Sequence, residues 1–130
     1  MATGLIVREP GDPLTSLEKA LLARLCAGDW KGSSEAREQL VHARWGGYSV
    51  EGCECFLIQI PPERALPLVP KFSGGPFAFL DVSGAELGFG LLELWLEGGV
   101  LHSVDYIPLD GSDGDKLPGL EHVSGTPFKG

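Results

Sequence analysis

Two apolar runs on either side of Gly98-Gly99 are the feature of this sequence that most restricts its fold. The first run ends at Glu97 and the second begins at Val100, and both alternate apolar with polar side chains. Adjacent glycines supply the positive φ angles of tight turns, so residues 90–107 predict an antiparallel β-hairpin. A hairpin of this kind must bury one of its faces against other elements.

The register of this hairpin depends on the number of residues in its turn. A two-residue turn would place Leu92 opposite Asp105 and Leu94 opposite Ser103, which mixes apolar and polar groups on one face. A three-residue turn separates them, and we therefore predict that register. The predicted core face carries Leu92, Leu94, Leu96, His102, Val104 and Tyr106, and the opposite face carries Glu93, Trp95, Glu97, Leu101, Ser103 and Asp105.

Two segments before residue 47 have the signals of α-helices. Thr15 and Glu18 form a capping-box pattern, and leucines with helical spacing follow them, so a helix is predicted over about 16–27. A second helix is predicted over about 34–44, after a pair of serines and before Gly46-Gly47.

The remaining apolar segments predict strands over residues 48–50, 53–60 and 77–82, the first two joined by a turn at 51–52. We predict an α+β fold with two layers, in which the N-terminal helices pack on one face of an antiparallel sheet of four or five strands. The 130 residues are expected to form a single domain, 1–130. Residues 1–12 are expected to be a flexible lead or a short strand, and residues 108–130 an extended tail.

The charge balance restricts the partners. The formal net charge is -8 and the isoelectric point is about 4.7, so the surface repels phosphate backbones and anionic lipids, and we predict neither nucleic acid nor a membrane as a partner. No signal-peptide pattern and no run of about 18 apolar residues is found. The odd number of cysteines, three, then favours reduced thiols and a cytoplasmic location.

Cys53 and Cys55 are two residues apart on a predicted strand, so both thiols could bind one metal ion. A tetrahedral site needs two further ligands and no second cysteine pair exists, so no metal and no cofactor is predicted, and the pair is interpreted as packing thiols. No metalloprotease, nucleophile-elbow or phosphate-loop motif is present, so no catalytic residue is predicted and a non-enzymatic role is favoured.

The acidic face of the hairpin is the leading candidate for a binding site. Trp95 lies among Glu93, Glu97 and Asp105 on this face, and a large aromatic side chain surrounded by acids is typical of a protein-binding surface. We therefore predict a protein-interaction module that binds a basic protein partner.

An alternative function remains open. A small-molecule-binding protein or an enzyme would need a pocket between the sheet and the helices or under the loop of residues 61–76, near His102, Cys55 and Tyr106. A homodimer joined through the sheet is compatible with either function.

Two segments resemble a loose class of small uncharacterised bacterial proteins. They are the end of the first helix, Leu25-Cys-Ala-Gly-Asp29, and the hairpin from Leu94 to Tyr106. In that class a helix ending in LLAGD precedes a late hairpin and an acidic tail. Some members are suspected immunity factors of toxin systems, and others are orphan domains on mobile gene cassettes. The resemblance implies an immunity- or inhibitor-like protein and supplies no catalytic residues, and this chain departs from the class at Gly98 and in its cysteine pair.

Overall fold

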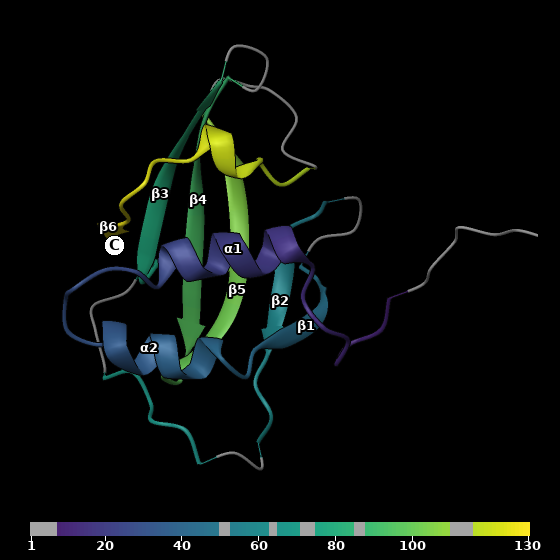
Figure 1. Ribbon diagram of the computed structural model, residues 1–130, viewed down its shortest axis with the longest axis vertical. Helices are drawn as coiled ribbons and strands as arrows, with labels where there is room; N and C mark the ends of the chain where they lie inside the picture. Colours follow the sequence, from purple (N-terminus) through teal and green to yellow (C-terminus); the bar gives the residue numbers. More distant parts are fainter. Residues whose placement is uncertain (1–7, 50–52, 63–64, 71–74, 85–87, 110–115) are drawn as a thin grey trace, which may run out of the picture.

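A computed structural model describes residues 8–49, 53–62, 65–70, 75–84, 88–109 and 116–130 of the chain. Within these residues, two helices precede an antiparallel sheet of six strands with the spatial order β1-β2-β5-β4-β3-β6 (Figure 1). The elements are α1 (Ser16–Leu25), α2 (Ser33–Leu40), β1 (Arg44–Tyr48), β2 (Phe56–Gln59), β3 (Ala78–Gly84), β4 (Gly88–Glu97), β5 (Val100–Pro108), the 3-10 turn η1 (Leu120–His122) and β6 (Phe128–Lys129). The α+β class and the antiparallel sheet are confirmed, whereas the predicted number of four or five strands is wrong.

The start of α1 follows directly from its sequence. The Thr15 hydroxyl accepts a hydrogen bond from the Glu18 amide at 3.1 Å, and the Glu18 carboxylate accepts one from the Thr15 amide at 2.9 Å, so the predicted capping box is confirmed. Glu18 is only 4% exposed, and the guanidinium of Arg8 donates to both of its oxygens. The same guanidinium lies 4.1 Å from the ring centre of Trp45 in β1, so the buried charge is paired and the helix start is fixed to the sheet.

Both helices end earlier than their sequence pattern predicts. The helix α1 ends at Leu25 rather than at residue 27, and α2 ends at Leu40 rather than at residue 44. Residue 44 instead begins β1, which pairs with β2, so the need for a sheet partner limits the length of the second helix. The predicted turn at residues 51–52 lies outside the described residues.

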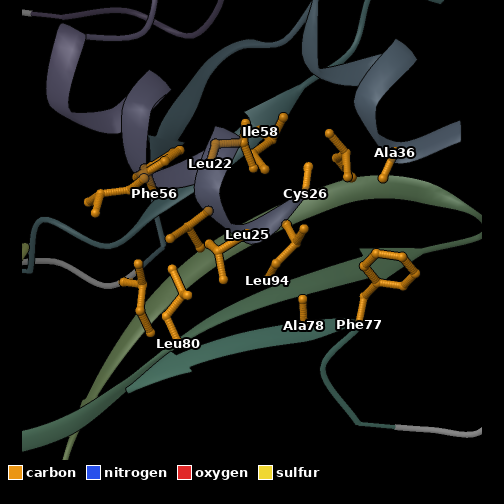
Figure 2. Packing of buried hydrophobic residues seen from close by; sticks show 14 of the residues in the cluster. Leu22, Leu25, Cys26, Ala36, Phe56, Ile58, Phe77, Ala78, Leu80 and Leu94 are labelled. Atoms are coloured by element: carbon orange, nitrogen blue, oxygen red, sulfur yellow. The ribbon is translucent and has the colours of Figure 1, made fainter. Parts of the chain in front are cut away.

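The apolar side chains of α1 face the sheet. The helix contacts β3 and β4, and α2 contacts β5; both helices lie in front of the sheet in Figure 1. Leu22 and Leu25 belong to the same buried cluster as the sheet residues Leu80 and Leu94, as Figure 2 shows, and all four are fully buried. Each buried leucine contributes roughly 1.5–3 kcal/mol to stability before entropic costs.

The turn of the hairpin differs from the prediction. Gly98 and Gly99 form a two-residue turn with φ angles of 60° and 81°, and Glu97 pairs directly with Val100. The register then shifts between Leu96 and Trp95, which leaves one additional residue in β5 at this point, a β-bulge. The predicted three-residue turn is therefore wrong, because a bulge in β5, and not a longer turn, restores the alternation of apolar and polar side chains.

The bulge exchanges the faces of two residues. Leu101 pairs with Leu96 and is buried in the core, while His102 lies beside Glu97, so their predicted faces are wrong. Beyond the bulge the predicted faces hold. Leu92, Leu94, Val104 and Tyr106 are buried on the core side, and Leu92 pairs with Tyr106 as Leu94 does with Val104.

The described part of the C-terminal segment adds to the sheet. Phe128 of β6 pairs with Phe79 of β3 and their rings stack at 5.2 Å, while Val123 forms an isolated bridge with Val82. Residues 116–130 therefore cover the edge of β3, and they supply the sixth strand that was absent from the predicted sheet.

Gln39 of α2 is the most deeply buried amide of the described residues, at 1% exposure. Its side-chain nitrogen donates to the carbonyls of Pro67 and Gly99 at 2.8 and 2.9 Å, and its oxygen accepts from the Leu101 amide at 2.9 Å. These backbone groups lie in a loop and at the hairpin turn, beyond the last paired residues of β2 and β5. One side chain therefore joins α2, the hairpin turn and the loop around Pro67.

We predict that Gln39→Leu lowers the free energy of unfolding by about 2–4 kcal/mol, because the Pro67 carbonyl and the Leu101 amide would lose their hydrogen bond to Gln39, and the Gly99 carbonyl would keep only its bond from the Val69 amide. Gln59→Leu is the matched control, since Gln59 lies exposed on β2 and should change stability by no more than about 0.5 kcal/mol. Urea denaturation of both variants measures the difference. Equal stabilities would show that the Gln39 amide is not a structural link.

Candidate functional site

Four residues of the β4–β5 hairpin form what we term the acidic hairpin face: Glu93, Trp95, Glu97 and Asp105. Residues 93, 95 and 97 alternate along β4 with side chains of the core side, so they project from the face of the sheet opposite to Leu92 and Leu94. Glu93 is the direct cross-strand partner of Asp105, and Trp95 that of Ser103. The structure thus brings all four predicted residues to one surface.

Hydrogen bonds fix the orientation of two of these carboxylates. The indole nitrogen of Trp95 donates to Glu93 at 3.1 Å. Asp105 accepts from the hydroxyls of Ser49 and Ser103, each at 3.1 Å. Two acids and the tryptophan are therefore held in place before any partner binds, which lowers the entropy that binding would cost.

The fourth residue, Glu97, lies at the turn and is paired with His102. Its carboxylate is 3.2 Å from the imidazole of His102, and the two side chains are 76% and 45% exposed. An exposed pair of this kind contributes little to stability. His102 was expected on the core side, and only the bulge, which the sequence pattern did not reveal, brings it to Glu97.

The charge of this surface is not balanced by basic residues of the central strands. The strands β3, β4 and β5 contain Asp81 in addition to the three acids of the hairpin, and their sequences include neither lysine nor arginine. Asp81 is exposed on β3 opposite Leu91 of β4. The centre of the sheet therefore carries four carboxylates, and His102 is its one basic side chain.

Apolar side chains flank the acids on the same sheet, and the sequence analysis did not single them out. Phe89 of β4 is 66% exposed, and Ile107 of β5 and Leu109, which follows that strand, are 40% and 62% exposed. The alternation of side chains along β4 could have revealed Phe89 from the sequence. It continues from Glu93 back through Leu91 to Phe89, so both apolar residues lie on the same face of the sheet as Glu93. Exposed apolar groups beside an acidic centre are a common composition for a protein-binding surface.

The residues of the alternative pocket separate into two places. The backbone amide of Tyr106 donates to the Cys55 sulfur at 3.2 Å, so these two residues are in contact. His102 lies four positions away along β5, roughly 13 Å at the rise of a strand. The ring of Tyr106 packs over Gly90 so closely that a Cβ atom at position 90 would lie 2.6 Å from that ring. Three surface cavities of about 350, 290 and 250 Å³ are lined by residues other than these.

Two of the three thiols are buried. Burial raises the pKa of Cys26 to about 12. Burial is also the main cause that raises the pKa of Cys55 to about 12, and the hydrogen bond from Cys53 adds to that shift.

Over the described segments, no group of three or more histidine, cysteine, aspartate or glutamate side chains is placed to hold a metal ion. No helix in the same segments has the length and apolar character needed to cross a membrane.

Comparison with known proteins gives no relative, since no family model, no curated protein and no solved structure matches this chain. Its function must therefore be inferred from the chemistry of its own surfaces.

The raised pKa of Cys26 predicts a loss of stability in alkaline solution. Below about pH 9 the Cys26 thiol is protonated in the folded and in the unfolded chain. Above that pH the unfolded chain releases the proton, whereas the folded chain retains it up to about pH 12. The free energy of unfolding should therefore fall with rising pH, and Cys26→Val should make this slope shallower. Urea denaturation from about pH 8 to about pH 11 measures both slopes. Equal slopes in both proteins would contradict the assignment.

Proposed function

We propose that this chain is a non-enzymatic protein-interaction module that binds a basic protein partner through the acidic hairpin face. One observation carries the proposal: the central strands bear four carboxylates and neither lysine nor arginine, arranged around a partly buried tryptophan. The net charge of -8 extends the same field over the whole molecule. The proposal includes an immunity- or inhibitor-like role in a bacterial cytoplasm, which the resemblance of the hairpin favours.

Electrostatic attraction would guide the partner to this face. Like-signed charges on a sheet surface attract an oppositely charged protein over several ångströms and raise its association rate. Because this attraction acts through water, salt screens it. A basic partner should therefore bind faster and more tightly at low ionic strength.

Trp95 would act as the anchor of the interface. Its ring offers a large apolar area, and its hydrogen bond to Glu93 already fixes its orientation. Tryptophans in such positions carry much of the binding energy of protein interfaces. The exposed apolar side chains of Phe89 and Ile107 would extend the contact beyond the acids.

The proposal predicts the effect of two substitutions on a purified complex. Glu93→Lys should abolish or strongly weaken binding, because it reverses a charge in the centre of the face. Trp95→Ala should weaken binding by about 2 kcal/mol, roughly 30-fold in Kd. Glu38→Lys is the matched control, since it makes the same charge change at an exposed position of α2 and should leave the affinity within about twofold.

The experiment has two stages. Affinity capture from cell lysate with the wild type, Glu93→Lys and Glu38→Lys identifies proteins that only Glu93→Lys fails to retain. Titration of the purified partner at increasing salt then measures Kd for each variant. Binding that responds neither to Glu93→Lys nor to salt would contradict the proposal. Stabilisation by a small metabolite instead of a protein would favour the alternative function, with Cys55 and Tyr106 as its first candidates.

A further inference from the structure

Cys53 and Cys55 meet immediately before β2. The thiol of Cys53 donates to the sulfur of Cys55 with only 2.7 Å between the two sulfur atoms. Residues 53–55 belong to no helix or strand, and β2 begins only at Phe56. On a strand, residues two positions apart would be separated by roughly 6–7 Å. The local backbone therefore brings together two side chains that a regular strand would hold apart.

The two thiols differ in their surroundings. Cys53 is partly exposed, and its sulfur accepts a hydrogen bond from the Cys55 amide at 3.2 Å. Cys55 is 4% exposed, and its sulfur accepts one from the Tyr106 amide of β5 at 3.2 Å. A reagent in solution therefore reaches Cys53 before Cys55.

We propose that Cys53 and Cys55 form a reversible disulfide by exchange with a low-molecular-weight disulfide such as oxidised glutathione, with Cys53 as the attacking thiol and Cys55 as the resolving thiol. The inference is independent of the proposed protein-binding function. It assigns a redox role to a pair that the sequence analysis interpreted as packing thiols.

The exchange takes place in two steps. The Cys53 thiolate attacks one sulfur of oxidised glutathione, which forms a mixed disulfide and releases one glutathione thiolate. Cys55 then loses its proton to the released thiolate or to water and attacks the Cys53 sulfur, which forms the Cys53–Cys55 disulfide and releases the second glutathione. The two protein sulfurs are oxidised by two electrons, and one glutathione disulfide is reduced to two glutathione molecules.

Proximity compensates for the weak acidity of Cys55. Its buried thiol has a raised pKa, so only a small fraction is ionised at neutral pH. The Cys53 sulfur is nevertheless in direct contact with it, and reactions between groups held in contact have very high effective concentrations. The bond needs only a small further approach, since sulfur atoms in a disulfide are about 2.05 Å apart.

Equilibration of the folded wild type in glutathione buffers, followed by acid quenching, alkylation in urea and intact-mass analysis, tests the inference. The wild type should lose two of its three alkylatable thiols and the mass of two hydrogen atoms, with no retained glutathione. Cys55→Ser should retain one glutathione on Cys53, and Cys53→Ser should not react. The equilibrium constant for disulfide formation should be at least about tenfold larger in the folded chain than in urea.

Three results would overturn the inference: a lasting glutathione adduct on the wild type, a disulfide between two chains, or equal oxidation of folded and unfolded chains. Absence of any reaction in the folded wild type would do the same. Circular dichroism of the two serine variants shows whether they fold. If one does not, the mass and thiol count of the wild type decide the outcome without it. Cys26→Ala serves as the control, because Cys26 is fully buried and its removal should leave the exchange unchanged.

Discussion

The buried amide of Gln39 is the contact on which the arrangement of the helices, the hairpin turn and the proline-rich loop depends. Its three hydrogen bonds are made with the carbonyls of Pro67 and Gly99 and with the amide of Leu101. A buried amide that lost these partners would cost more than an apolar side chain in the same place. The short helix α2 is therefore held at the end of the hairpin by polar satisfaction as well as by apolar packing.

The β-bulge at His102 decides how the two faces of the sheet are used. Before the bulge, Leu101 enters the core; after it, Val104 and Tyr106 do, while Ser103 and Asp105 remain on the acidic side. One additional residue thus allows a tight glycine turn and a continuous apolar core in the same hairpin. The same irregularity places His102 beside Glu97, so it shapes both the stability and the charge of the outer face.

The thiol pair and the acidic hairpin face meet at β5. The sulfur of Cys55 contacts the backbone of Tyr106, and the neighbouring charge of Asp105 is a minor cause of the raised pKa of Cys55 after burial and the Cys53 contact. Glu54, between the two cysteines, accepts a hydrogen bond from the Leu117 amide at 2.8 Å. Strand β5 therefore connects the proposed partner surface with the proposed redox pair, and Glu54 connects that pair with the C-terminal segment.

Local patterns in the sequence determined the capping box at Thr15, the hairpin around Gly98-Gly99 and the acidic side of β4, because each depends on neighbours along the chain. Only the tertiary structure decided the exchange of Leu101 and His102, the early end of α2 and the addition of β6 to β3. It also decided the contact between the Cys53 and Cys55 sulfurs. These features depend on bulges, strand pairing and irregular backbone, whose energies arise from residues distant in sequence. Alternation alone showed which residues share a face, but it could not show where the alternation is interrupted.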